Sequence, residues 1–192
     1  MKPMISNDRT YRTFEMRSAD DGMIVTGYAA VFDTPTVLYR DGDVDYWEVI
    51  DPHAFDHTAM ADVVLNYNHT GKPVARTKNG TLQLRVDGTG LYIQADLSGT
   101  EEGRRLYEEV KGGYIDQMSF AFTVSEDSYD RNTHTRRILG IDRLFDVAAV
   151  DCPAYDATSI SARDYFSAEA ERARQAEASH RKRKQLEILT NV

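Results

Sequence analysis

Short runs of apolar and β-branched residues, separated by turn-forming residues, fill the chain up to about Phe166. Residues 81–86 alternate polar and apolar side chains at a period of two, which is typical of a half-buried strand. They follow Asn79-Gly80, a dipeptide that favours hairpin turns. The other strand-like runs are 23–32, 46–50, 62–67, 91–97, 117–124, 136–141 and 144–150. The polar stretch 125–135 is expected to be a hairpin tip, and the pattern predicts a mainly β domain.

One segment in this region has the spacing of an amphipathic helix. Ser98 or Thr100 can cap its first turn, and Leu106 and Val110 lie four positions apart on one face. Gly112-Gly113 then ends the helical pattern. The fold class that we expect is therefore mainly β with a few helices (α+β), arranged as a closed or curled β-barrel flanked by helices.

The composition changes at Ala168. From there onward the chain has no Gly or Pro and is rich in Ala, Glu, Arg and Gln, which favours a helix. We therefore divide the chain into a domain over residues 1–167 and a helical C-terminal tail over residues 168–192. The basic cluster Arg181–Lys184 is most simply a solvated helix end, with binding to nucleic acid or to an acidic partner as the alternative.

Length and charge narrow the classes of function. The 192 residues suit one domain with a sizeable core. With 23 basic and 31 acidic side chains the net charge is −8, which argues against non-specific binding to nucleic acid. The charge is uneven, because the acidic excess lies in residues 1–167 and the tail is slightly basic.

A single cysteine, Cys152, excludes an internal disulfide and a cysteine-based zinc site. We read it as a packing residue in a protein of a reducing compartment. No apolar run approaches the length of a membrane helix, and the first residues lack the apolar stretch of a signal peptide. These features favour an intracellular protein that does not interact with membranes.

No phosphate-binding glycine loop or dinucleotide fingerprint is present, and we expect neither a cofactor nor a metal. His53 and His57 have the spacing of a helical metal site, but no general-base Glu lies between them and no third ligand is evident. We favour a proline-initiated helix that buries Phe55 and leaves both histidines at the surface.

Three polar residues stand at positions that packing alone does not explain. His69 lies where an apolar run ends and a glycine turn begins, a position that suits a general base. Ser119 lies among apolar residues, and on strict alternation its neighbours on the same face are small. Both residues also have a purely structural interpretation. His69 can be a hydrogen-bonded histidine of a loop, and Ser119 can be a serine whose hydroxyl bonds a backbone carbonyl.

Asp146 interrupts the apolar run 144–150 and, on strict alternation, shares a face with Leu144 and Ala148. A carboxylate in such a strand is costly unless it is paired. An imidazole N–H is a suitable partner, since an acid that orients the base completes a serine triad. Asp142 and Asp151, at the strand ends, are alternatives for this role.

Several motifs, taken in order, resemble the prohead maturation proteases of tailed phages, serine peptidases similar in fold to herpesvirus assemblins. The resemblance covers about residues 22–165. The residues that carry it lie at 27–32, 68–69, 90–91, 100–104, 112–122, 144–148 and 153–155. The resemblance implies an assemblin-like barrel and a serine-type endopeptidase.

By this resemblance His69 matches the catalytic histidine, and Ser119, in the stretch Met-Ser-Phe-Ala-Phe, matches the nucleophile. Asp146 matches the position of an acid in the family, where the herpesvirus relatives place their third triad member. The chain departs from the family pattern at Ala121, where many members have Gly, and at Thr70, where many have an acid. No oxyanion hole can be matched to particular residues.

The resemblance also implies the partners. The substrates would be the major capsid protein with its scaffolding segment, or a separate scaffold, and the enzyme itself by autoprocessing. The enzyme would be packaged inside the procapsid in the host cytoplasm, with the tail as a detachable targeting or scaffold-binding segment. Assemblin relatives work as dimers, which leaves a homodimer open. The rival hypothesis is a non-enzymatic scaffold or assembly subunit on a degenerate protease fold.

Overall fold

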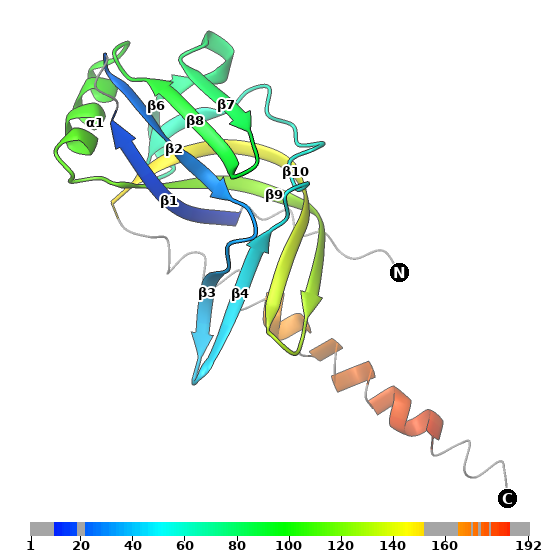
Figure 1. Cartoon of the computed structure of the whole chain (residues 1–192). Helices are drawn as coiled ribbons and strands as arrows, with labels where there is room; N and C mark the ends of the chain where they lie inside the picture. The colour runs from blue at the N-terminus through cyan, green and yellow to red at the C-terminus, as the bar shows by residue number, and fades with distance from the viewer. Residues whose placement is uncertain are drawn as a thin grey trace, which may run out of the picture.

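The long hairpin formed by β9 and β10 is the centre of the fold (Figure 1). The structure, a computed structural model, describes residues 10–18, 22–151, 165–169, 171–172, 174–176 and 178–184. The strands before the helix are β1 (Thr10–Ser18), β2 (Ile24–Val31), β3 (Thr36–Asp41), β4 (Val44–Ile50), β5 (Val64–Tyr67), β6 (Thr70–Arg76), β7 (Leu82–Val86) and β8 (Gly90–Asp96). A 3₁₀ turn, η1 (Thr77–Asn79), precedes β7, and α1 (Glu101–Lys111) is followed by β9 (Gln117–Asp130) and β10 (Thr135–Val150).

The strands form one open sheet in the order β3-β4-β10-β9-β1-β2-β8-β7, with β5 added to β10 and β6 to β5. The prediction of a mainly β protein with helices is confirmed. The prediction of a closed barrel is wrong, because closure requires the two end strands to pair. Among the described residues, β3 pairs with β4 and β7 pairs with β8, but β3 and β7 do not pair with each other.

Strand β10 is long enough to serve two parts of the molecule. Its first part, Thr135–Ile138, pairs with β4, and its later part, Asp146–Ala149, pairs with β5, both in parallel. β9 follows it as an antiparallel partner along the whole length. Two separate strands were predicted here, over 136–141 and 144–150, because polar Asp142 and Arg143 divide the apolar pattern. The structure joins them into one strand, and the loop of the hairpin shortens to residues 131–134.

One face of the β9–β10 hairpin forms the main core. Met118, Phe120 and Phe122 alternate along β9 and are fully buried on that face. Helix α1 covers this end of the core with Leu106, Tyr107 and Val110. Of the two predicted caps, Ser98 and Thr100, the structure has Thr100, whose Oγ1 accepts a hydrogen bond of 2.9 Å from the Gly103 N–H.

The other end of the hairpin projects with β3 and β4 as an arm, and the C-terminal helical residues lie against it (Figure 1). The described helical residues begin at Tyr165, three positions before the compositional change at Ala168. Phe166 is 2% exposed and packs against Leu38, Tyr46 and Tyr129 of the arm. Cys152 lies outside the described residues.

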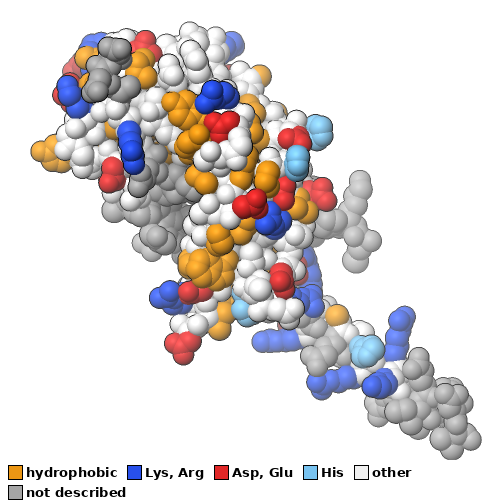
Figure 2. All heavy atoms as spheres, in the orientation of Figure 1, with side chains coloured by type: hydrophobic (Ala, Val, Ile, Leu, Met, Phe, Trp, Pro, Cys, Tyr) orange, Lys and Arg blue, Asp and Glu red, His pale blue; other side chains and the backbone are white. Residues whose placement is uncertain are grey.

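Beyond this contact the helical residues carry many Lys and Arg side chains that face solvent (Figure 2). Arg181–Lys184 are helical and exposed, as expected of a solvated helix end. No helix among the described residues is long and apolar enough to cross a membrane.

Candidate active site

His69 lies at the tip of the β5–β6 hairpin. Tyr67 pairs with Thr70, so Asn68 and His69 are the two residues of the turn. Both have positive φ, 48° and 56°, which is the backbone of a type I′ hairpin turn. Residues other than glycine seldom adopt this left-handed conformation, although Asn and His do so more often than most. The turn therefore holds His69 in a strained backbone, a feature that clusters at functional sites.

The His69 ring contacts Asp146 of β10. The two residues are brought together from 77 positions apart, with 2.5 Å between His69 Nδ1 and Asp146 Oδ1. The two side chains are largely buried, 14% exposed for His69 and 6% for Asp146. A buried carboxylate bonded to Nδ1 fixes the orientation of the ring and leaves the other nitrogen, Nε2, for a second partner.

A β-bulge aims Asp146 at this histidine. Leu144 pairs with Phe122, whereas Asp146 pairs with Ala121, so the register between β10 and β9 shifts between these two pairs. Leu144 consequently lies on the core side with Phe122, and Asp146 lies on the opposite face. The expectation that Asp146 and Leu144 share a face is wrong, because it assumed strict alternation through the bulge.

Ser119 lies on the same face as Asp146. It pairs with Ala148 of β10, two positions after Asp146, and Ala148 pairs in turn with Asn66 of β5. Residues opposite one another in a sheet project to the same side, so these side chains gather on one face. The small side chains of Ala121 and Ala148 stand beside Ser119 on this face. Among the described residues none offers the buried Ser119 Oγ a hydrogen bond, and the structure shows no bond between it and His69.

Asn66 is a residue whose importance the sequence did not reveal. Its side chain is 7% exposed, and its Oδ1 finds no hydrogen-bond partner among the described residues. A buried amide oxygen without a partner carries a desolvation cost, so its presence calls for an explanation. The available signal was a polar residue within the apolar run 62–67, next to His69 in the chain.

The two alternative acids have other partners. Asp151 accepts a hydrogen bond of 2.9 Å from the Tyr67 hydroxyl, and its backbone N–H donates to Asn68 Oδ1 over 3.3 Å. Asp142 is exposed and accepts a bond of 3.4 Å from Thr123 Oγ1. The contact of 2.5 Å with His69 Nδ1 favours Asp146 for the role of the orienting acid.

His53 and His57 lie in a series of turns rather than in the expected helix. The packing agrees with expectation, since Phe55 is buried and both histidines are exposed. His53 contacts Asp56, three positions away, over 3.1 Å. The described residues contain no group of three or more His, Cys, Asp or Glu side chains placed to hold a metal ion.

A serine, a histidine and a carboxylate on one face of a sheet are the groups used in acyl transfer by serine hydrolases. The comparison with protein families gives the same class. Residues 12–173 match the model of the Caudovirus prohead serine protease family, and the chain belongs to this family. It is therefore a serine protease of phage capsid maturation. No match to the chain was found among the curated proteins or among the solved structures.

Proposed function

We propose that Ser119 is the nucleophile of this protease, His69 its general base and Asp146 the acid that orients the base. The observation that carries the proposal is the buried contact of 2.5 Å between His69 and Asp146. Ser119 supports it, because a buried hydroxyl without a described partner stands on the face that Asp146 shares. Many family members have an acid where this chain has Thr70. Here Thr70 donates a hydrogen bond to the Tyr67 carbonyl, and we assign the orienting carboxylate to Asp146 instead.

The reaction follows from these roles. His69 Nε2 takes the proton of Ser119 Oγ while Oγ bonds to the scissile carbonyl carbon. The C–N bond then breaks, and the leaving amine takes the proton from His69. Water attacks the acyl-enzyme with His69 again as base, the Oγ–C bond breaks, and Ser119 regains its proton. Asp146 holds the ring and stabilises its charged form throughout.

We further propose that the substrates include the scaffolding segment of the cognate major capsid protein and the enzyme itself, acting inside the procapsid. The family supports capsid and scaffold substrates in general. We also propose that the C-terminal helix binds the scaffold, and its exposed basic residues support this role (Figure 2). Truncation after residue 169 tests it: the proposal fails if incorporation into particles and processing are both unchanged.

Replacement of Ser119 tests the nucleophile. Ser119→Ala should abolish processing of the cognate capsid precursor and labelling by a fluorophosphonate in assembled particles, while the melting temperature stays close to that of the parent. Ser128→Ala is the matched control, because Ser128 is an exposed serine of the same strand. Processing by Ser119→Ala at the parent rate would remove the assignment and favour the rival hypothesis of a scaffold on a degenerate protease fold.

A further inference from the structure

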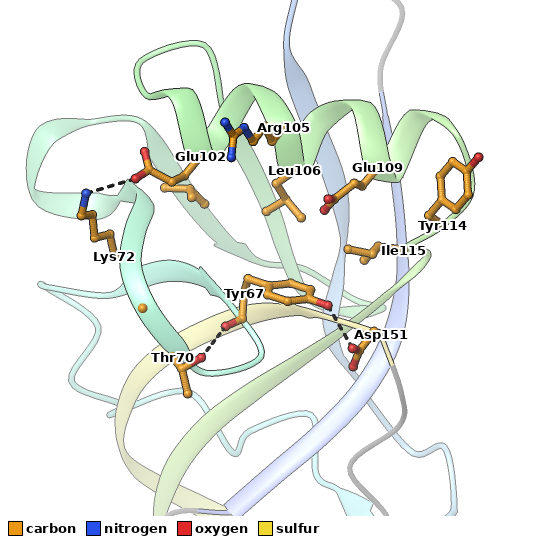
Figure 3. A pocket seen from close by; sticks show the side chains of 12 residues that line it. Tyr67, Thr70, Lys72, Glu102, Arg105, Leu106, Glu109, Tyr114, Ile115 and Asp151 are labelled. Atoms are coloured by element: carbon orange, nitrogen blue, oxygen red, sulfur yellow. Dashed lines mark hydrogen bonds and ion pairs between the residues drawn. The ribbon is translucent and has the colours of Figure 1, made fainter.

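A cleft of about 680 Å³ opens beneath helix α1 (Figure 3). It begins one residue after His69, at Thr70, and lies between the β5–β6 hairpin and helix α1. Tyr67 of its lining pairs with Ala149, whose side chain belongs to the core, so the cleft opens on the sheet face opposite Ser119.

The floor of the cleft is apolar. Val74, Leu106 and Ile115 are buried there, from β6, from α1 and from the segment before β9. Two aromatic side chains stand at the same end, Tyr114 with 84% of its surface exposed and Tyr67 with 39%. An exposed tyrosine beside an apolar floor favours the methylene stem of a long side chain and the face-on approach of a cation.

The charges of the lining differ between the two ends. At one end Lys72 Nζ lies 3.1 Å from Glu102 Oε1, so these two charges balance (Figure 3). At the other end Glu109 projects from α1 toward Tyr67 and Ile115, and Asp151 bonds Tyr67 (Figure 3). Among the described residues no Lys or Arg forms an ion pair with Glu109. This end is acidic.

The pKa of Tyr67 is affected by the same negative charges. The hydrogen bond to Asp151, burial and the negative charges of Asp151 and Glu109 together raise the pKa of Tyr67 above its ordinary value. A negative environment that opposes loss of a proton from Tyr67 attracts a cationic group.

We propose that this acidic end of the cleft binds a Lys or Arg side chain of the substrate, in a part of the substrate chain outside the segment that is cleaved. The stem of that side chain lies on Leu106 and Ile115, and its cationic end lies between Glu109 and Asp151. The proposal rests on the proposed function only in taking the bound peptide to be the substrate. It requires no role for Ser119.

Binding is therefore measured in the full chain carrying Ser119→Ala, which separates recognition from catalysis. The probes are the peptide acetyl-Ala-Ala-Arg-Ala-Ala-amide and its counterpart with citrulline, an uncharged isostere, in place of Arg. NMR titration of the backbone amides should show saturable shifts at Leu106 and Ile115 with the Arg peptide. The citrulline peptide should bind at least about tenfold more weakly, since it lacks the charge-assisted hydrogen bonds.

Two variants locate the site. Glu109→Gln should weaken the Arg peptide about tenfold, whereas Glu108→Gln, an exposed neighbour on α1 outside the cleft, should leave binding unchanged. Equal affinity for the two peptides, or an unaffected Glu109→Gln variant, overturns the proposal. Neither result bears on Ser119, whose own test measures processing.

A different observation, the buried amide of Asn66, carries a second inference. Asn66 and Ser119 flank Ala148 in one row across β5, β10 and β9. Two strand spacings separate their backbones, about 10 Å between Cα atoms. A substrate carbonyl bonded to Ser119 Oγ would stand on the face that Asn66 shares, within reach of that gap. We infer that Asn66 donates a side-chain N–H to the oxyanion that forms there.

The missing hydrogen bond of Asn66 fits this role. Its Oδ1 is buried without a described partner, and rotation of the planar amide presents the NH₂ group instead without a change of shape. A donor that has no partner in the free enzyme and bonds the oxyanion acts only in the transition state, which is the arrangement that raises kcat. The inference depends on Ser119 as nucleophile.

Asn66→Leu distinguishes catalysis from structure. The rate of fluorophosphonate labelling in assembled particles should fall about 10²- to 10³-fold, because the covalent adduct resembles the oxyanion. The melting temperature should stay equal or rise, since the variant removes an unsatisfied buried amide. A labelling rate within threefold of the parent overturns the inference, and so does a lower melting temperature with a proportional loss of folded protein. Ser119→Ala would still abolish labelling in either case.

Discussion

At the scale of single residues, the polar side chains inside apolar strands mark the site. A core position occupied by serine, asparagine or aspartate costs stability unless its polar atoms are paired. Ser119 and Asn66 keep buried oxygen atoms without described partners, and Asp146 is bonded to His69. The sequence shows these residues as exceptions to alternation, but it does not show that they share one face.

The acid of the proposed triad is testable at this scale. Asp146→Asn keeps the shape of the side chain but disturbs the tautomer of His69, so we expect the rate of precursor processing to fall about 10³- to 10⁴-fold. Asp151→Asn should cause a much smaller loss, because the Asp151 carboxylate bonds Tyr67. The measurement is the labelling and processing rate of each variant in assembled particles.

Asp142→Asn is the control for these variants. Asp142 is an exposed acid of the same strand as Asp146, and its carboxylate accepts a hydrogen bond from Thr123 Oγ1. It should process at the parent rate. A large loss confined to Asp151→Asn would transfer the role of the acid from Asp146 to Asp151.

At the scale of elements, two local irregularities assemble the site. The type I′ turn at Asn68 and His69 directs the ring back over the sheet, and the bulge between Leu144 and Asp146 turns the carboxylate away from the core. A regular strand at either place would put the side chain on another face. The short apolar run before His69 is visible in the sequence, whereas the two-residue turn and the bulge depend on pairing with β6 and β9.

The elements themselves were predicted to different degrees. The helix over α1 was predicted with its cap, because capping and periodicity act within one segment. The single long β10 was not, since pairing with β9 carries the strand through polar Asp142 and Arg143. Pairing across the sheet overrides local composition there.

At the scale of the whole molecule, the arm ties the C-terminal helix to the domain. Phe166 packs among Tyr46 and Tyr129, and the Arg136 guanidinium lies 4.2 Å from the centre of the Tyr165 ring. Burial raises the pKa of Tyr129 to about 12, which reflects how well this cluster excludes water. The boundary at residue 167 was predicted from the change in composition and stays a prediction. The described helical residues already begin at Tyr165.

This contact predicts how the helix detaches. Phe166→Ala removes a buried aromatic side chain at a cost of about 3 kcal/mol, so the opening equilibrium of the helix should increase about 10²-fold. Hydrogen exchange of the amides at residues 166–169 measures it. Ser167→Ala, at an exposed neighbouring position, should leave exchange unchanged. Equal protection in the two variants would mean that Phe166 does not anchor the helix.

The sequence by itself determined the mainly β class and the α1 helix, and its ordered motifs led to the proposal of His69, Ser119 and Asp146 as the triad. These depend on alternation, capping and ordered motifs, all of which are written locally along the chain. Only the tertiary structure decided that the sheet is open, that Asp146 contacts His69, and that Asn66 joins Ser119 on one face. Each of these depends on strand order and register between segments distant in the chain, and no local pattern specifies that pairing.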